Sequence, residues 1–297
     1  MKMIVLIATC GRPELLKRTL DSLSDVIKPD CYTGTIVIEN GSKKGIEKLT
    51  ESYKEKLNIS YMFTEQANKS NALNVAMKDI TNTAIFFSDD DVLYDKNILM
   101  EYAVAAKNID SGVFFGGSFT VDYETEPSDF LKKYMPPSAV GSNWPNDMSE
   151  VSRPIFLGSN WLAFADDIKL VGGFDPNFGP GSATNSTGQE TNMQKRLLLK
   201  GSKGRYVPGA KVKHFVPAER SSPEWTIKRI HRVGISYGLS NQFSKYELSI
   251  MRMKTIICPF CRIIPFISDE TKFKIDYYGS FYRGQLQGRK LLRKQQC

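Results

Sequence analysis

The segment that most constrains the fold is residues 84–91, where an apolar run ends abruptly at three adjacent carboxylates. The Ala-Ile-Phe-Phe run at residues 84–87 predicts a strand that is buried on both faces. Three like charges side by side repel one another, and they cannot share a dry core without a counter-charge. We therefore expect Asp89, Asp90 and Asp91 to lie just beyond the carboxyl end of this strand, where open α/β sheets bind their ligands.

Two interpretations of this acidic segment remain open from its residues alone. Carboxylate oxygens are the preferred ligands of a hard divalent cation such as Mg²⁺ or Mn²⁺. Alternatively, the segment is an acidic turn before the next helix, with Asp95 as the N-cap of that helix.

Apolar runs alternate with helical periodicities along the first 110 residues. Besides 84–87, strands are expected at residues 4–8, 35–38 and 59–63, with amphipathic helices between them. This βαβαβ alternation predicts an α/β fold with a Rossmann-like, mostly parallel sheet and helices on both faces.

The pattern becomes irregular after residue 111. Short strands separated by breaks are expected at 112–116 and 118–122, and again within 205–216, where Pro208-Gly209 would interrupt the run. Two segments without a clear period predict surface loops, the second of them mobile by its Gly, Pro, Ser and Asn content: residues 124–154 and 175–188.

The composition is that of a soluble globular protein. Of the 297 residues, 41% are apolar and 24% charged, and no apolar stretch approaches the roughly 18–20 residues of a membrane-spanning helix. The apolar start runs straight into Gly11-Arg12-Pro13, which favours a first core strand over a signal peptide. The cysteines are odd in number and scattered, at positions 10, 31, 258, 261 and 297, which predicts free thiols in a reducing cytoplasm.

The charge is unevenly distributed along the chain. Residues 201–297 hold 19 Lys/Arg against 6 Asp/Glu, a balance of +13, whereas residues 1–200 hold 21 against 26, a balance of −5, and the two sum to the net +8. A basic terminal third indicates an anionic partner, which is nucleic acid, a membrane surface or phosphate groups.

The basic third contains two apolar segments. Residues 223–241 predict a helix, and residues 255–268 are rich in Ile and Phe but are interrupted by two prolines and Arg262. The second segment is too short to span a membrane, so it either lies on a bilayer surface or packs on the rest of the chain or on a second copy in a homodimer.

An ordered set of short motifs gives a more specific indication. They are Ile-Ala-Thr-Cys-Gly-Arg at 7–12, Val-Ile-Glu-Asn-Gly-Ser at 37–42, Asn-Lys-Ser-Asn-Ala-Leu-Asn at 68–74, Phe-Ser-Asp-Asp-Asp at 87–91, Gly-Gly-Phe-Asp at 172–175, Gly-Gln-Glu-Thr at 188–191 with Arg196-Leu197 and Gly201, and His214. In this order, over roughly residues 3–235, the chain resembles a family-2 glycosyltransferase of the GT-A fold, of the type that builds bacterial surface polysaccharides.

The resemblance implies a domain organisation and an activity. Residues 1–220 would form the GT-A catalytic domain, with a nucleotide-binding half at 1–110 and an acceptor half at 111–220. Residues 221–297 would form a basic helical extension that contacts a membrane or a partner chain. The expected activity is metal-dependent, inverting transfer of a sugar from a UDP or dTDP donor to a hydroxyl of a glycan or lipid-linked acceptor, as in lipopolysaccharide synthesis, on the cytoplasmic face of the inner membrane.

The resemblance also assigns residues to the donor. Glu39 stands where the family usually has Asp, and its carboxylate would read the imide N–H of the base, while Lys69 would neutralise phosphate. Asn71 stands where some members carry Arg. Asp91 would hold Mn²⁺ or Mg²⁺ on the diphosphate, with His214 completing the metal shell. The remaining donor-binding residues would be Ala8, Thr9, Arg12, Asp89 and Asp90.

The acceptor side rests on fewer residues. Glu190 is the expected catalytic base, because Gln189 replaces the other acidic residue of the family motif; the alternative is a first-turn Glu favoured by the helix dipole. Trp161, Phe174 and Asp175 would line the acceptor side, although a Trp at such a position is more often core. His214 alternates with Val212 and Val216, which also fits a core histidine.

Two other function classes remain. A sugar-phosphate nucleotidyltransferase would also need an acidic metal site, but the segment after the first strand is a poor version of the phosphate loop of that class. A nucleic-acid-binding protein would use the basic end, but no recognised binding motif supports it, and we expect no nucleic-acid partner.

Overall fold

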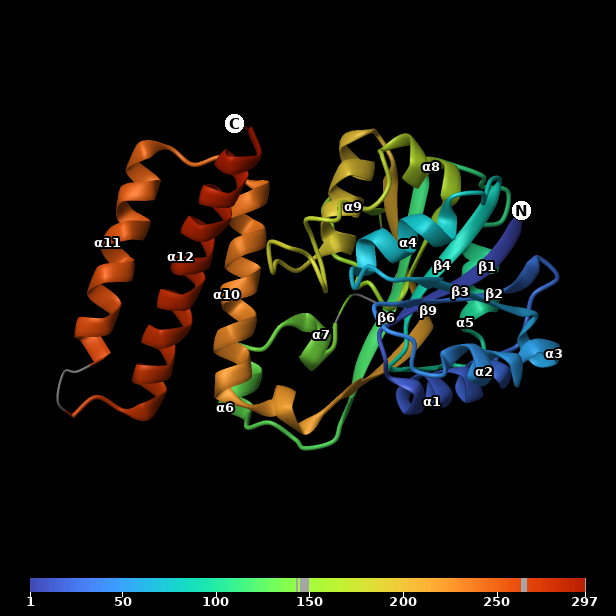
Figure 1. Cartoon of the computed structure of the whole chain (residues 1–297), viewed down its shortest axis with the longest axis horizontal. Helices are drawn as coiled ribbons and strands as arrows, with labels where there is room; N and C mark the ends of the chain where they lie inside the picture. Colours follow the sequence, from blue (N-terminus) through green and yellow to red (C-terminus); the bar gives the residue numbers. More distant parts are fainter. Residues whose placement is uncertain (143, 145–149, 263–265, 297) are drawn as a thin grey trace. The chain divides into compact units, whose positions relative to one another are not determined.

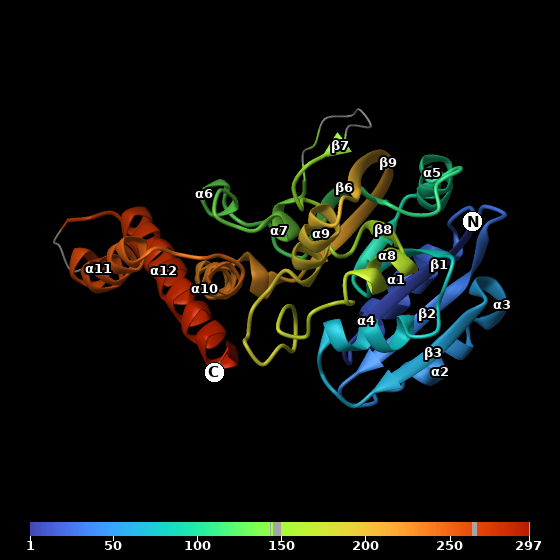
Figure 2. The same cartoon turned by 90° about the horizontal axis from the view of Figure 1, so that it is seen from above.

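The computed structural model describes all residues except 143, 145–149, 263–265 and 297 (Figures 1 and 2). It divides into two compact units. Unit 1 comprises Met1–Asp122, Pro137–Pro176 and Gln189–Phe215, and unit 2 comprises Tyr123–Pro136, Asn177–Gly188 and Val216–Cys297. Residues 221–297 therefore lie entirely in unit 2, together with two segments from earlier in the chain.

Four parallel strands form the first half of the sheet. They are β1 (Lys2–Thr9), β2 (Tyr32–Asn40), β3 (Ile59–Thr64) and β4 (Thr83–Asp89), in the order β3-β2-β1-β4. The first six residues of β4 are all buried. The doubly buried strand predicted at 84–87 is thus confirmed, as is the parallel order of this half.

The second half of the sheet is antiparallel, so the sheet as a whole is mixed. Beyond β4 follow β8 (Trp161–Phe164), β6 (Val113–Tyr123), β9 (Lys203–Val216) and β5 (Val92–Tyr94), and β7 (Glu150–Val151) pairs with β9. Strand β5 lies between the acidic segment and α5 (Ile98–Ala105), whose N-cap is Asn97 and not Asp95.

The breaks predicted within residues 112–122 and 205–216 are wrong, because β6 and β9 are continuous strands. Their glycines mark close approach, not turns. A Cβ at Gly117 would lie 1.9 Å from the carbonyl oxygen of Ala210, and one at Gly209 would lie 2.3 Å from a carboxylate oxygen of Glu101. Gly117 therefore needs the smallest residue while the backbone stays extended, whereas a Cβ at Gly209 would have to displace only the Glu101 side chain.

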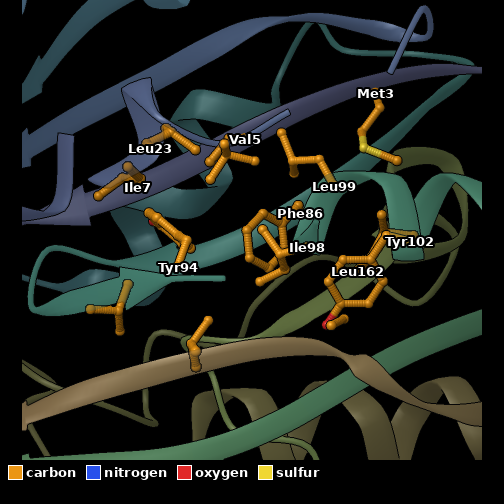
Figure 3. Packing of buried hydrophobic residues seen from close by; sticks show 14 of the residues in the cluster. Met3, Val5, Ile7, Leu23, Phe86, Tyr94, Ile98, Leu99, Tyr102 and Leu162 are labelled. Carbon is orange, nitrogen blue, oxygen red and sulfur yellow. The ribbon is translucent and has the colours of Figure 1, made fainter. Parts of the chain in front are cut away.

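Helices cover both faces of the sheet in unit 1, as predicted. On one face Met3, Val5 and Ile7 of β1 pack in one cluster with Leu23 (Figure 3). On the other face the alternate β1 residues Leu6 and Ala8 pack with the helix at Lys69–Met77. Apart from α5, the unit 1 helices are α1 (Pro13–Ser24), α2 (Ile46–Glu51), α3 (Lys54–Leu57), α4 (Lys69–Met77), α7 (Pro137–Val140), α8 (Ala165–Leu170) and α9 (Gln189–Leu199).

Unit 2 is helical. Besides α6 (Asp129–Lys132) and a 3-10 turn at Ala218–Ser221, it contains three long helices: α10 (Pro223–Ser240), α11 (Lys245–Arg262) and α12 (Asp269–Gln296). The helix predicted at 223–241 is confirmed. Helix α11 continues through Pro259, so this proline does not interrupt it; the second predicted interruption, at residue 265, lies outside the described residues.

Helices α10 and α12 approach each other through facing glycines. A Cβ at Gly234 would lie 2.4 Å from the carbonyl oxygen of Phe281, and one at Gly284 would lie 2.1 Å from that of His231. Gly238 and Gly288 make equally close approaches to the opposite backbone. Two glycines spaced four apart on each helix let the backbones touch, which is the same packing device that small residues provide in membrane helices.

Residues 177–188 form neither helix nor strand, but they are held by hydrogen bonds within unit 2. The hydroxyls of Thr184 and Ser186 donate to the Asn177 carbonyl at 2.5 and 2.7 Å, and the Thr187 N–H donates to Ser236 Oγ at 2.7 Å. The predicted loop therefore has a defined local structure next to α10. Among the described residues, no helix is both long and apolar enough to cross a membrane.

Candidate functional site

The carboxyl ends of three parallel strands bring the predicted donor-binding residues to one edge of the sheet. In the strand register Ala8 pairs with Asp89, and Thr9 pairs with Glu39. Asp90 and Asp91 form the turn that follows β4. Together with Asp89, the last residue of that strand, we call them the acidic turn. The edge that the sequence predicted for ligand binding therefore carries the predicted polar residues of β1, β2 and β4.

Arg12 supplies the counter-charge that the acidic segment needs. Its Nε donates to Asp90 Oδ2 at 3.1 Å, its Nη2 also binds Asp90, and its Nη1 donates to Asp91 Oδ2 at 2.8 Å. The Thr9 hydroxyl donates to Asp90 Oδ2 at 2.5 Å. Arg12 was predicted to line the nucleotide pocket. In this structure its guanidinium group holds the acidic turn together, and the Arg12 side chain is 37% exposed.

Asp90 is fully buried, and this alters its protonation. Burial is the largest influence on the pKa of Asp90 and raises it. The charges of Asp91 and Asp89 also raise this pKa, whereas Arg12 and the Thr9 hydrogen bond lower it. Together they give Asp90 a pKa of about 6. Conversely, the three carboxylates outweigh the effect of burial on Arg12 and raise its pKa. The acidic turn thus favours the charged form of Arg12 but disfavours the charged form of Asp90.

Lys69 links the acidic turn to Glu190. It lies at the first position of α4, where the Asn68 side chain caps the helix, and its ammonium group pairs with Asp89. Burial lowers the pKa of Lys69, but the charge of Asp89, followed by those of Glu190 and Asp91, outweighs burial and raises it. The acidic turn and Glu190 therefore act on the same buried ammonium group.

Glu190 lies in the first turn of α9, and its carboxyl group packs against Gly158. A Cβ at Gly158 would lie 3.4 Å from Glu190 Cδ and 3.5 Å from Oε2. The side chain of Gln194 anchors the helix, because it accepts from the Phe156 N–H at 3.1 Å and donates to the Phe156 carbonyl at 2.9 Å. Gly158 was not among the predicted residues, since a single glycine before a strand carries no distinguishing signal.

His214 faces Asp91. Asp91 immediately precedes β5, whose first residue, Val92, pairs with His214 of β9. His214 is 5% exposed, and its Nε2 lies 3.3 Å from Asp91 Oδ1. The ring packs against Phe119 with 5.3 Å between centroids. Within the described part of the chain, its Nδ1 is buried without a hydrogen-bond partner. The predicted burial with Val212 and Val216 is confirmed, and the same residue also offers a nitrogen beside a carboxylate.

The residues present could hold a divalent cation only if a bound phosphate and water supplied part of its ligands. Within the described ranges, no three His, Cys, Asp or Glu side chains are grouped so that they could hold a metal ion. Asp91 and His214 offer two donor groups within 3.3 Å of each other. A cation there would take its remaining ligands from water and from phosphate oxygens, as Mg²⁺ usually does in phosphate-binding sites.

Glu39 is fully buried, and both of its carboxylate oxygens accept hydrogen bonds. Oε1 accepts from the Lys44 N–H and Oε2 from the Tyr61 hydroxyl, each at 2.7 Å. Burial and, next, the hydrogen bond to Glu39 raise the pKa of Tyr61. An open pocket of about 440 Å³ lies beside this pair and is lined also by Lys43, Gly45, Glu47, Lys48 and Glu51. In this structure Glu39 presents no surface to a base, so its base-reading role stays a prediction.

The three residues predicted for the acceptor side have different surroundings. Trp161 and Phe174 are each 1% exposed and pack with Phe87 in an aromatic cluster, the Trp161 ring stacking on Phe87 at 4.7 Å. Asp175 is half-buried and acts electrostatically on Arg196. Trp161 is therefore a core residue in this structure, which was the alternative interpretation of its position in the sequence. Asn71 is also half-buried, and its backbone N–H donates to the Asn68 side chain at 2.9 Å.

Comparison with known proteins gives one family match. The family model described as Glycosyl transferase family 2 matches residues 4–158. This range includes β1, β2, α4 and the acidic turn, but neither Glu190 nor His214. No curated protein sequence matches the chain.

Solved structures match over nearly the whole chain. The mannosyltransferase PcManGT from Pyrobaculum calidifontis, in complex with GDP-Man and Mn²⁺, is 16% identical, with 99% of this chain and 74% of that chain covered and a TM-score of 0.56. TarS 1-349 of S. aureus with UDP-GlcNAc is 13% identical, with coverages of 100% and 92% and a TM-score of 0.56. GalNAc-T7 with UDP, GalNAc and Mn²⁺ is 14% identical, with coverages of 93% and 54% and a TM-score of 0.57.

Proposed function

Because this chain belongs to glycosyl transferase family 2 and is a glycosyltransferase of the predicted GT-A fold, we propose that it transfers a sugar with inversion from a nucleoside-diphosphate donor to an acceptor hydroxyl. UDP is the favoured nucleotide, with dTDP as the alternative, since a carboxylate at Glu39 suits the imide N–H of uracil or thymine. The acceptor is a glycan or a lipid-linked glycan of a cell-surface polysaccharide.

The observation that carries this proposal is the position of Lys69. Its ammonium group pairs with Asp89 at the donor edge of the sheet and is also influenced by Glu190 and Asp91. A donor diphosphate needs positive charge on one side, and an attacking hydroxyl needs a base on the other. Lys69 and Glu190 supply these two groups in neighbouring positions.

The roles of the chain's own residues follow from these positions. Lys69 offsets the negative charge that grows on the departing diphosphate. Glu190 accepts the proton of the acceptor hydroxyl as its oxygen attacks the anomeric carbon opposite the leaving group, and a single displacement inverts that carbon. A positioned general base typically contributes about 10²–10⁴-fold to the rate. Arg12 and Thr9 keep Asp90 and Asp91 in place by hydrogen bonding.

Asp91 and His214 would hold a divalent cation, Mn²⁺ or Mg²⁺, beside the donor. When bound, such a cation supplies Lewis-acid stabilisation to the phosphate oxygens. The complexes of PcManGT and GalNAc-T7 contain Mn²⁺, and an imidazole ligand suits transition metals better than Mg²⁺. We therefore favour Mn²⁺ as the physiological ion.

A pair of glutamate substitutions tests the proposal. We expect Glu190→Gln to retain binding of a UDP-sugar and to lower transfer by roughly 10²–10⁴-fold, since it removes only the base. Glu224→Gln is the matched control, because Glu224 also lies in the first turn of a helix but is exposed on α10. The measurements are UDP-sugar binding by calorimetry and acceptor-dependent UDP release with glycan and lipid-linked acceptors. Equal UDP release by the wild-type protein and Glu190→Gln would remove Glu190 from the mechanism.

A further inference from the structure

Helix α11 carries an exposed apolar stripe. Tyr246, Met253, Ile256, Ile257 and Phe260 are 74, 52, 63, 45 and 66% exposed. At about 100° per residue they fall on one side of the helix, whereas Leu248 and Met251 on the opposite side are buried. We call these five residues the α11 stripe. Five large apolar side chains in one row are more than the scattered single exposures that an ordinary surface shows.

Cations flank the α11 stripe on both sides. At the same helical spacing, Lys245 and Arg252 lie along one edge, and Lys254 lies along the other edge beside Glu247, the one acidic residue of α11. Lys254 Nζ also donates to the Tyr282 hydroxyl of α12 at 2.8 Å, which fixes its edge of the helix against the bundle. An apolar row between basic rows is the pattern of a helix that lies in the interface of an anionic membrane.

We propose that α11 binds flat on an anionic lipid bilayer, with the α11 stripe inserted among the acyl chains and its flanking cations at the headgroups. The excess of 13 positive charges in residues 201–297 adds long-range attraction to such a surface. Insertion without crossing agrees with the lack of a spanning helix among the residues that the structure describes.

Charge favours the bilayer over a second copy of the chain as the occupant of this surface. A two-fold symmetric contact through the α11 stripe would place the same patch of both copies face to face. Such a contact would bring Lys245, Arg252 and Lys254 of both copies into one interface, with a single Glu247 from each copy to offset them. Anionic headgroups can pair with Lys245 and Arg252 at once, while Lys254 keeps its hydrogen bond to Tyr282.

This inference goes beyond the proposed glycosyl transfer and does not depend on it, because the α11 stripe and its cations lie in unit 2 and bind lipid without a donor. It would nevertheless place a lipid-linked acceptor and the enzyme at the same surface. Donor binding and vesicle binding can therefore fail independently.

Vesicle co-sedimentation tests the inference on the full chain. We expect wild-type protein to bind vesicles of phosphatidylcholine with 30 mol% phosphatidylglycerol and to bind pure phosphatidylcholine vesicles much less. Ile256→Ser/Phe260→Ser should lower the partition coefficient by at least roughly tenfold, since it removes two inserted side chains. Lys245→Gln/Arg252→Gln should lower it by roughly fivefold for each charge on anionic vesicles only. The matched control is Leu170→Ser/Leu199→Ser, which removes two exposed apolar residues of unit 1.

Three outcomes would overturn the inference. They are no vesicle binding by the wild-type protein, equal binding by the wild-type protein and Ile256→Ser/Phe260→Ser, and equal losses in the stripe and control variants. Size-exclusion chromatography with light scattering measures the molar mass and so tests the alternative of a second copy. If the wild-type protein is a dimer that does not bind vesicles, and Ile256→Ser/Phe260→Ser is a monomer, the α11 stripe is a dimer contact. A far-UV circular dichroism spectrum and a melting temperature equal to those of the wild-type protein verify that each variant is folded.

Discussion

At the scale of single residues, the acidic turn combines groups that a folded chain rarely buries together. Asp90 has no exposed surface, yet it lies between two other carboxylates. Arg12 and Lys69 make this possible because each binds the turn directly. Both cations come from segments distant in the sequence, so the network forms only when β1, α4 and β4 are already assembled. Local repulsion is thus balanced by long-range pairing.

The raised pKa of Asp90 predicts a specific pH dependence of stability in the unliganded protein. Its pKa is about 6 in the folded chain against an ordinary value of 3.8, so the folded state binds the proton more tightly. The stability that Asp90 contributes is therefore fully present below pH 3.8 and is lost as the pH rises through about 6. Relative to Asp90→Asn, we expect the wild-type free energy of unfolding to fall between pH 4 and pH 6 and then to level off.

Urea unfolding in EDTA at pH 4, 5, 6 and 7 measures this difference. Asp79→Asn is the control, because Asp79 is exposed and its substitution leaves the acidic turn intact. Parallel wild-type and Asp90→Asn profiles would contradict the assignment of the shift to Asp90.

At the scale of elements, the sequence predicts those features that depend on neighbouring residues. The strand at 84–87 and the helix at 223–241 follow from unbroken apolar runs or periods, and both are present in β4 and α10. Gly117 and Gly209 were misleading, because a glycine that permits close approach and a glycine that breaks a strand look alike in one sequence. The contacts of Arg12 with Asp90 and of Gly158 with Glu190 join residues far apart in the chain, which local patterns do not encode.

The packing of α10 on α12 predicts that two glycine-to-alanine substitutions in α12 change the free energy of unfolding by different amounts. Gly284→Ala should destabilise the chain by about 1–3 kcal/mol or more, because the added methyl group would lie 2.1 Å from the His231 carbonyl oxygen and overpack a backbone contact. For Gly279→Ala, on the same helix, the nearest atoms are side-chain atoms, Cys258 Cβ at 3.2 Å and Arg283 Nη1 at 3.4 Å. It should be clearly less destabilising than Gly284→Ala, since a shift of a few tenths of an ångström relieves these contacts and alanine favours helix by about 0.5–1 kcal/mol over glycine.

Chemical unfolding followed by far-UV circular dichroism compares the two variants. Because both replace glycine with alanine within α12, intrinsic helix propensity cancels between them. If Gly284→Ala is as stable as Gly279→Ala, the close α10–α12 contact does not exist in solution.

At the scale of the whole molecule, the incomplete metal site predicts that cation and donor bind cooperatively. Asp91 and His214 offer two groups, and among the described residues no three acidic, histidine or cysteine side chains are grouped so that they could hold a metal ion. Mn²⁺ alone should therefore bind weakly and shift the melting temperature little, whereas Mn²⁺ with UDP completes the shell from phosphate oxygens. By linkage, Mn²⁺ must raise UDP affinity by the same factor by which UDP raises Mn²⁺ affinity.

A thermal-shift matrix of UDP against Mn²⁺ measures this coupling, since a ligand at 100 times its Kd stabilises the folded chain by about 2.7 kcal/mol. Asp91→Ala should retain the metal-independent part of the UDP shift and lose the increment due to Mn²⁺, while Asp79→Ala, an exposed control, should keep both. If Mn²⁺ alone raises the melting temperature as much as Mn²⁺ with UDP, the protein provides a complete cation site by itself. The proposal that phosphate oxygens complete the site would then be wrong. A UDP shift unaffected by Mn²⁺ or EDTA would instead leave charge neutralisation at the donor edge to Lys69, the ammonium group already paired with Asp89 there.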